Sequence, residues 1–406
     1  MTDHPLHLAV ALSDVGWHPA AWREDPDGAR RLGDPEHWAA QVRLAEEGLL
    51  DLVTIEDGLG LQTDGYGPQT PRTDRVRGRV DAVLLASRIA PLTSRIGIVP
   101  TVVTAHTEPF HVATALQTLD FVSTGRAGVR LTAGPSAADA RLVGVRTFPD
   151  FTPDRLDDPE IVAFVEDLFA EAGEHAEVLR RLWDSWEDGA EIRDVPTGRF
   201  IDRDRLHYAD FRGRFFSVKG PSIVPRSPQG QPPVAILAHG PLPYRLGAQV
   251  GDVLFVTPHG DDDLVRILSE VRAAEEEVRR PAPPQLVLGD LVVVLDDDPS
   301  AARGRLDRLD ALSGEAYASD ARIFAGSPAE LADLIEAWHR AGYAGVRLRP
   351  AATAVDLPQI VHGVVPELQR RGLFRTAYEA DTLRGHLGLD RPLSRYARTP
   401  DLVEAP

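Results

Sequence analysis

The sequence contains no cysteine among its 406 residues. This absence excludes disulfide bonds, thiolate metal sites and cysteine nucleophiles, and it is typical of a protein from a reducing compartment. Long apolar runs are also missing, since no stretch approaches the roughly 20 residues that span a bilayer. The first residues carry Asp3 and no basic stretch before an apolar run, which indicates a strand and not a signal peptide. We therefore expect a cytoplasmic protein.

Positive charge is scarce in this chain. Aspartate and glutamate total 62 residues against 44 lysines and arginines, and the formal net charge is -18. Such a charge repels a nucleic-acid backbone and an anionic membrane surface, and no stripe of basic residues with interleaved aromatics offsets it. What the chain does have is 43% hydrophobic residues, enough for a large core in a globular protein. We expect neither a nucleic acid nor a membrane as partner.

Short apolar runs alternate with amphipathic segments almost from end to end, which is typical of βα units on a parallel sheet. Eight runs are candidate strands: 6–12, 52–55, 96–103, 128–133, 234–238, 253–256, 286–295 and 346–348. A doubly wound open sheet would show a similar pattern. Eight successive units, with no phosphate-binding glycine pattern after the first strand, favour the closed barrel. We predict an α/β fold of the (βα)8 TIM-barrel type.

The helices between these runs have recognisable starts. Asp34 and Pro35 supply an N-cap and a first-turn proline, and Ser327 with Glu330 forms a capping box. The acidic runs at 261–263 and 296–298 suit helix N-termini, where negative charge is favourable.

Three stretches exceed a minimal barrel, namely residues 57–79, 135–159 and 189–233. The first two follow candidate strands and would lie at the C-terminal mouth, where barrel active sites form. The third contains a β-hairpin pattern over 207–216. The tail after Gly372 is expected to wrap the outside or to meet another subunit. We predict one domain, 1–406, with insertions at the mouth and a C-terminal tail.

The sequence shows no nucleophile elbow, Walker loop or kinase motif, and no histidine spacing suited to zinc. Four histidines follow candidate strands, His18, His106, His111 and His239, and three of them lie just past a strand end: His18, His106 and His239. In a barrel these positions converge on the mouth, so the three can share a pocket. Taken singly, each is better explained as a surface or loop histidine. Asp57 ends the second strand and suits either a polar cofactor edge or a turn before glycine.

Several segments together resemble the luciferase-like flavin monooxygenases, in the branch of nitrilotriacetate monooxygenase, dibenzothiophene-sulfone monooxygenase and pristinamycin synthase. The resemblance covers most of the chain and is most specific near its end. The segments are Gly16-Trp17-His18-Pro19-Ala20-Ala21-Trp22-Arg23, 45–51, 93–97, 101–111, 118–120, 125–128, 182–188, 219–221, 228–232, 365–375, 382–384 and 387–389.

The resemblance implies a flavin-dependent monooxygenase of a two-component system, which uses reduced FMN and O2 to oxidise a small organic substrate. A separate NAD(P)H-dependent flavin reductase would supply the reduced FMN. The flavin performs the oxygen chemistry, while the protein holds it, shields it from water and admits the substrate. By this resemblance His18 and His106 are the candidate catalytic residues, and Asp57, Thr101 and Thr104 are candidate cofactor contacts. Homodimers or homotetramers are expected from the family.

The chain departs from the family pattern where flavin phosphate is usually held. The family's histidine and tyrosine fall on Val165 and Phe169, and its phosphate-binding serine falls near Gly240. Arg130 and His239 offer a charged or polar donor in their place. Two alternatives stay open: a deazaflavin (F420)-dependent oxidoreductase, and a flavin-binding protein without turnover. The sequence does not indicate the substrate.

Overall fold

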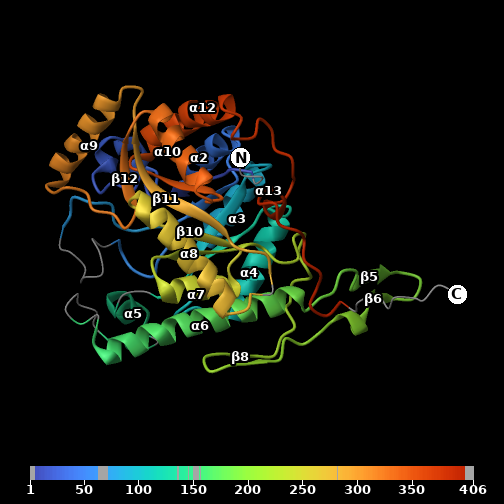
Figure 1. Ribbon diagram of the computed structural model, residues 1–406. Helices are drawn as coiled ribbons and strands as arrows, with labels where there is room; N and C mark the ends of the chain where they lie inside the picture. Colours follow the sequence, from blue (N-terminus) through green and yellow to red (C-terminus); the bar gives the residue numbers. More distant parts are fainter. Residues whose placement is uncertain are drawn as a thin grey trace.

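Eight parallel strands close into a barrel in the computed structural model of this chain (Figure 1). The structure describes residues 5–62, 72–134, 137–144, 146–149, 155, 157–280 and 282–397. Around the barrel the strands follow the order β10-β9-β4-β3-β2-β1-β13-β11, and pairing of β10 with β11 closes the ring. Their bounds are β1 His7–Leu12, β2 Leu52–Ile55, β3 Gly97–Val103, β4 Val129–Thr132, β9 Val234–Ala238, β10 Val253–Val256, β11 Leu286–Leu295 and β13 Gly345–Pro350. The predicted barrel and all eight predicted strands are confirmed.

A ninth strand, β12 (Arg322–Gly326), was not predicted. It pairs in parallel with the second half of β11, at Leu291–Leu295, while the first half of β11 pairs with β10. The ten-residue length of β11 makes both pairings possible. The apolar run just before the capping box at Ser327 was the available signal for β12.

Helices cover the outside of the barrel (Figure 1). Asp34 caps α2 and Ser327 with Glu330 forms the capping box of α10, as predicted. Among the described residues, no helix is long and apolar enough to cross a bilayer. The helices are α1 Pro26–Arg30, α2 Pro35–Glu47, α3 Ala82–Ile89, α4 Pro109–Val122, α5 Ala137–Val143, α6 Pro159–Asp184, α7 Pro241–Val250, α8 Asp261–Glu277, α9 Pro299–Ser313, α10 Pro328–Arg340, α11 Thr353–Gln359, α12 Val365–Arg370 and α13 Leu383–His386, with short turns at η1 Ala21–Arg23, η2 Ala90–Leu92, η4 Arg203–Arg205 and η5 Ile360–Val364.

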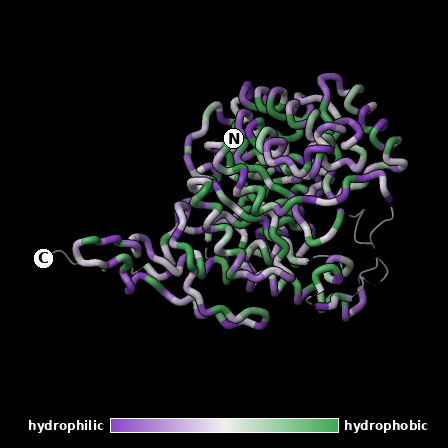
Figure 2. Tube along the Cα trace, turned by 180° about the vertical axis from the view of Figure 1, so that it is seen from behind, coloured by the Kyte–Doolittle hydropathy of each residue, from purple (hydrophilic) through white to green (hydrophobic). Residues whose placement is uncertain are grey.

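The stretch 189–233 forms two small antiparallel hairpins. The first pairs β5 (Glu191–Asp194) with β6 (Arg199–Ile201) and projects from the body (Figures 1 and 2). The second pairs β7 (Phe211–Arg212) with β8 (Ser217–Val218), which confirms the predicted hairpin. The other two predicted insertions lie partly outside the described residues, at 63–71, 135–136, 145, 150–154 and 156.

Hydrophobic residues gather inside the body, as the hydropathy colouring in Figure 2 shows. One cluster fills the lower barrel with strand residues such as Ala9, Leu52 and Val99, and the tail residues Leu383 and Leu387 join it. The sequence led us to expect a tail that wraps the outside. The tail does more than that. It inserts α13 under the barrel, because apolar side chains at that end would otherwise face water.

We predict that Leu383→Ala destabilises the protein by about 2–5 kcal/mol, because Leu383 is fully buried and its truncation leaves a cavity under the strands. Leu393→Ala is the matched control in the same tail, since Leu393 is 78% exposed and should change stability by less than about 0.5 kcal/mol. Urea unfolding followed by circular dichroism measures both. Equal midpoints for the two variants would contradict the conclusion that α13 fills the lower end of the barrel.

Candidate functional site

A network of buried charged side chains lies inside the upper barrel. Asp290 on β11 accepts hydrogen bonds from Arg347 on β13 at 2.9 and 2.5 Å, and from the Arg349 Nε at 2.9 Å. Arg347 also donates to the Thr54 Oγ1 on β2 at 3.2 Å. Arg130 on β4 pairs with Glu56. These contacts join four strands that are far apart in the sequence.

Burial and charge oppose each other at Asp290. Burial alone would raise the pKa of this carboxyl, but the charges and hydrogen bonds of Arg347 and Arg349 outweigh it and hold the pKa below 3.8. Asp290, Arg347 and Arg349 are all almost fully buried. Each charge is therefore compensated by a partner inside the barrel, as buried charges require.

The network reaches the surface through Asp320, which follows α9 and precedes β12. Arg349 donates to both Asp320 oxygens at 2.6 and 3.1 Å. Burial would raise the pKa of Asp320, but Arg349 lowers it to about 2. The His239 Nε2 lies 3.3 Å from Asp320, and its Nδ1 lies 3.0 Å from the Thr257 hydroxyl. The predicted residue His239 thus ends this polar chain at the rim.

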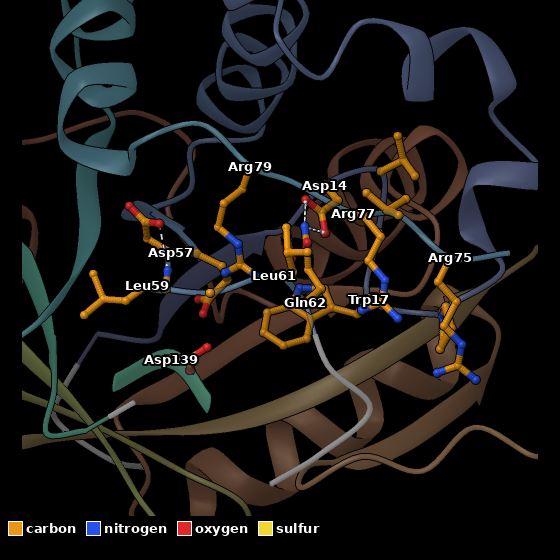
Figure 3. Close-up of a pocket in the computed structure, with 18 of the residues that line it drawn as sticks. Asp14, Trp17, Asp57, Leu59, Leu61, Gln62, Arg75, Arg77, Arg79 and Asp139 are labelled. Atoms are coloured by element: carbon orange, nitrogen blue, oxygen red, sulfur yellow. Dashed lines mark hydrogen bonds between the residues drawn. The ribbon is translucent and has the colours of Figure 1, made fainter. Parts of the chain in front are cut away.

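A cavity of about 510 Å³ opens at the C-terminal ends of β1 to β4 (Figure 3). Its wall comes from the loop after β1, the loop after β2, the segment before α3 and the ends of β3 and β4. Trp17 lies in this wall, and Arg349 stacks over its ring at 4.6 Å from the centroid. The cavity therefore rests on the charged network and lies at the mouth, where the sequence predicted a site.

Two predicted site residues line this cavity, Asp57 and His18. Asp57 accepts hydrogen bonds from the backbone N–H groups of Gly58 at 2.7 Å and Ala82 at 2.8 Å. Burial raises the pKa of Asp57, although those hydrogen bonds and Arg79 act against it. Asp57 thus fixes the turn after β2 and the start of α3.

His18 is fully buried at its side chain, and both ring nitrogens have partners. Its Nδ1 accepts from the Ala20 N–H at 3.1 Å, so its Nε2 carries the proton and donates to Asp310 at 3.0 Å. Burial lowers the pKa of His18, in opposition to Asp310. His18 is therefore a neutral ring near neutral pH.

The other candidates do not belong to the described wall of the cavity. Thr101 accepts from the Arg130 Nε at 3.0 Å, below the cavity. The Thr104 hydroxyl donates to the carbonyls of Thr132 and Ala133. The His106 ring stacks on Phe148 at 4.8 Å, and neither of its nitrogens has a hydrogen-bond partner. The roles proposed for these residues remain predictions.

Sequence reasoning missed the arginines of the segment before α3. Arg75, Arg77 and Arg79 all line the cavity and point the same way in Figure 3. Gln62 holds this segment in place, because its side-chain amide donates to the Gly78 carbonyl and accepts from the Gly78 N–H, both at 2.9 Å. The signal was present, since an acidic chain places four arginines within residues 72–79.

The N-terminus of α7 follows β9, the strand that pairs with β4 in the barrel. Gly240 is its N-cap residue and provides no side-chain cap. Pro241 and Pro243 carry no N–H group, so two donors of the first turn are absent. Val165 and Phe169 of α6 add no polar group. This end therefore offers a phosphate few donors besides His239.

Comparison with known proteins gives consistent results. A family model described as luciferase-like monooxygenase matches residues 17–345. N-acetyl-S-(2-succino)cysteine monooxygenase of Bacillus subtilis (strain 168) is 26% identical, with 97% of this chain and 98% of that protein covered. Nitrilotriacetate monooxygenase component A of Aminobacter aminovorans is 28% identical, with 97% of this chain and 98% of that protein covered.

The fold also matches solved structures. EDTA monooxygenase from Chelativorans sp. BNC1 superposes with a TM-score of 0.81 at 22% identity, covering 95% of this chain and 99% of that chain. This likeness concerns the fold and agrees with the barrel described above.

We predict that Asp290→Asn destabilises the protein by about 3–5 kcal/mol, because it removes the buried carboxylate that Arg347 and Arg349 share. Since the folded state holds the pKa of Asp290 below 3.8, the stabilisation is complete above that pH and is lost as the pH falls through the folded value. The exposed Asp297→Asn is the control. Unfolding free energies at pH 7 and pH 3 measure the effect, and a pH-independent difference between the variants would contradict it.

Proposed function

Because this chain belongs to the luciferase-like monooxygenase family, it is a flavin-dependent monooxygenase, and we propose that its flavin lies in the cavity beside Trp17 and Asp57. The observation that carries this placement is a deep cavity at the C-terminal ends of β1 to β4, on the face where barrel enzymes bind their substrates. Reduced FMN is the cofactor, used together with O2.

The cavity fits the flavin ring system in size and chemistry. Its volume of about 510 Å³ lies within the range of about 300–1,000 Å³ that is usual for cofactor sites. Trp17 offers an aromatic surface, and the Gly58 to Gly60 loop brings bare backbone to the wall. Rings of this kind bind through such a combination of flat apolar surface and a few polar groups.

The flavin phosphate does not fit the α7 end in the way the family pattern implies. Gly240 has no hydroxyl, and the prolines at 241 and 243 remove backbone donors. Arg130 is occupied by Glu56 and Thr101. We therefore assign no phosphate contact to Arg130, and only a polar contact at the rim to His239.

Bound reduced flavin supplies the reaction with O2, and the chain supplies the surroundings. The buried network borders the cavity, because Glu56 lines it and Arg349 stacks on Trp17. Asp57 fixes the loop that forms one wall. Both ring nitrogens of His18 are already hydrogen-bonded, so neither is available to a ligand. We therefore propose that His18 holds the cavity wall in place through its hydrogen bond to Asp310.

The catalytic role of His106 stays a proposal, supported by two buried ring nitrogens that have no hydrogen-bond partner among the described residues, and it requires the ring to turn toward the cavity. Thr101 and Thr104 are proposed to support the cofactor site indirectly, through Arg130 and the β4 backbone. We also propose that the chain forms one domain and that the protein lies in the cytoplasm. A NAD(P)H-dependent reductase is proposed to deliver its FMN, and the protein is proposed to form homo-oligomers.

The substrate is a small organic molecule. The relatives are named for chemically diverse compounds, including N-acetyl-S-(2-succino)cysteine, nitrilotriacetate, dibenzothiophene sulfone and long-chain alkane. Their names therefore do not select one substrate class for this chain.

We predict that the protein binds reduced FMN under anaerobic conditions and that Trp17→Ala weakens this binding about ten-fold, because ring stacking contributes roughly 1–3 kcal/mol. Trp17→Phe keeps an aromatic face and should stay within about threefold of wild type. Titration followed by flavin absorbance and fluorescence gives the dissociation constants. Absence of FMN binding to the wild-type protein in either redox state would refute the assignment, and equal affinity of the two variants would refute the placement beside Trp17.

A further inference from the structure

We propose that Arg77 and Arg79 form an anion-binding subsite of the mouth cavity, which takes a carboxylate or phosphate group of a ligand. This inference rests on the proposed function, since it concerns the cavity that holds the flavin. The ligand group belongs either to an anionic organic substrate or to the flavin phosphate, which finds few donors at α7.

The first observation is that neither guanidinium has a partner in the part of the chain that the structure describes. Among the described residues, Arg77 and Arg79 make no hydrogen bond and no ion pair, and the Arg77 Nη2 is buried without an acceptor. The neighbouring Arg75 differs, because it pairs with Glu315. A buried, unsatisfied guanidinium nitrogen is costly and requires an explanation. A ligand oxyanion in the cavity supplies one.

The second observation is that the backbone carrying the two side chains is held in place. Gly78 between them has a φ of +87°, a left-handed conformation that glycine adopts without strain. The Gln62 amide fixes Gly78 with two hydrogen bonds and donates to both oxygens of Asp14 at 3.1 Å. Farther along, Arg72 binds Asp74. The segment therefore presents Arg77 and Arg79 to the cavity without needing the ligand to order it.

The third observation concerns three of the carboxylates that line the same cavity. Glu56 is paired with Arg130, Asp14 accepts from Gln62, and Asp57 accepts from two backbone N–H groups. Arg79 acts on Asp14 and Asp57 through its charge, lowering the pKa of each against the effect of burial, but it hydrogen-bonds to neither. The hydrogen-bond donors of Arg77 and Arg79 are thus available to an incoming anion.

The positive charge of this subsite contrasts with the net charge of the whole chain. A protein with a net charge of -18 repels anions in general. A local group of arginines at the mouth places positive charge where a ligand must enter. Guanidinium groups also match planar carboxylates and phosphates through paired hydrogen bonds, which a general positive field does not provide.

The test compares wild-type protein with Arg77→Gln and Arg79→Gln. Arg303→Gln is the control, because Arg303 is exposed on α9 and has no partner among the described residues. Citrate binding is measured by calorimetry, and FMN and riboflavin binding by fluorescence, all at one ionic strength. Charge-assisted hydrogen bonds predict a loss of about ten-fold or more in the affected affinity.

The two sources give different patterns. If the subsite takes a substrate carboxylate, both variants lose citrate affinity and keep the affinities for FMN and riboflavin. If it takes the flavin phosphate, both lose FMN affinity while riboflavin binding is unchanged. Affinities for citrate and FMN that stay within about twofold of the control in both variants would overturn the proposal, while retained flavin binding would leave the monooxygenase assignment intact.

A second measurement covers variants that fail to fold. Phenylglyoxal modifies accessible arginines, and mass spectrometry of the wild-type protein reports the rate at Arg77 and Arg79. Citrate or FMN should slow modification at these two residues by about fivefold or more and leave Arg303 unchanged. Equal rates with and without both ligands would likewise overturn the subsite.

Discussion

The buried ion network around Asp290 is the constraint on which the rest of the structure depends. It neutralises Arg347 and Arg349 inside a closed barrel, where an unpaired charge would cost several kcal/mol. It also fills the upper barrel with side chains, so a ligand cannot descend between the strands. Any cofactor must therefore lie above the network, in the space that the loops leave. That space is the cavity at β1 to β4.

The two sides of the mouth differ in the chemistry they offer. At the α7 side, Gly240 and two prolines leave few donors, and His239 is already engaged with Asp320 and Thr257. At the β1 to β4 side, an aromatic face, glycine backbone and two arginines without partners among the described residues meet in one cavity. A family fold is thus retained while polar donors are concentrated on a different side of the mouth.

The repeating pattern of the barrel could be predicted from sequence because each strand is a local apolar run with its own flanking signals. The strand β12 was missed because it pairs with only the second half of β11. Such a pairing depends on the tertiary structure. In the sequence, Asp290 and Arg347 are charged residues within candidate strands and have no evident partner. The fold brings the Arg347 Nε to 2.9 Å from the Asp290 Oδ1. Asp57 and His18 were found because they follow strands. The placement of Arg77 depends on the hydrogen bond from the neighbouring Gly78 N–H to Gln62, a contact across a loop that no local pattern reveals.

A crystal structure of the protein grown with FMN and dithionite without oxygen tests the central claim most directly. The account predicts that the flavin ring lies in the cavity against Trp17 and beside the Asp57 loop, above an unchanged Asp290 network. A ring bound near His239, with its phosphate at Gly240, or a ring inserted between the strands in place of the network, would contradict it.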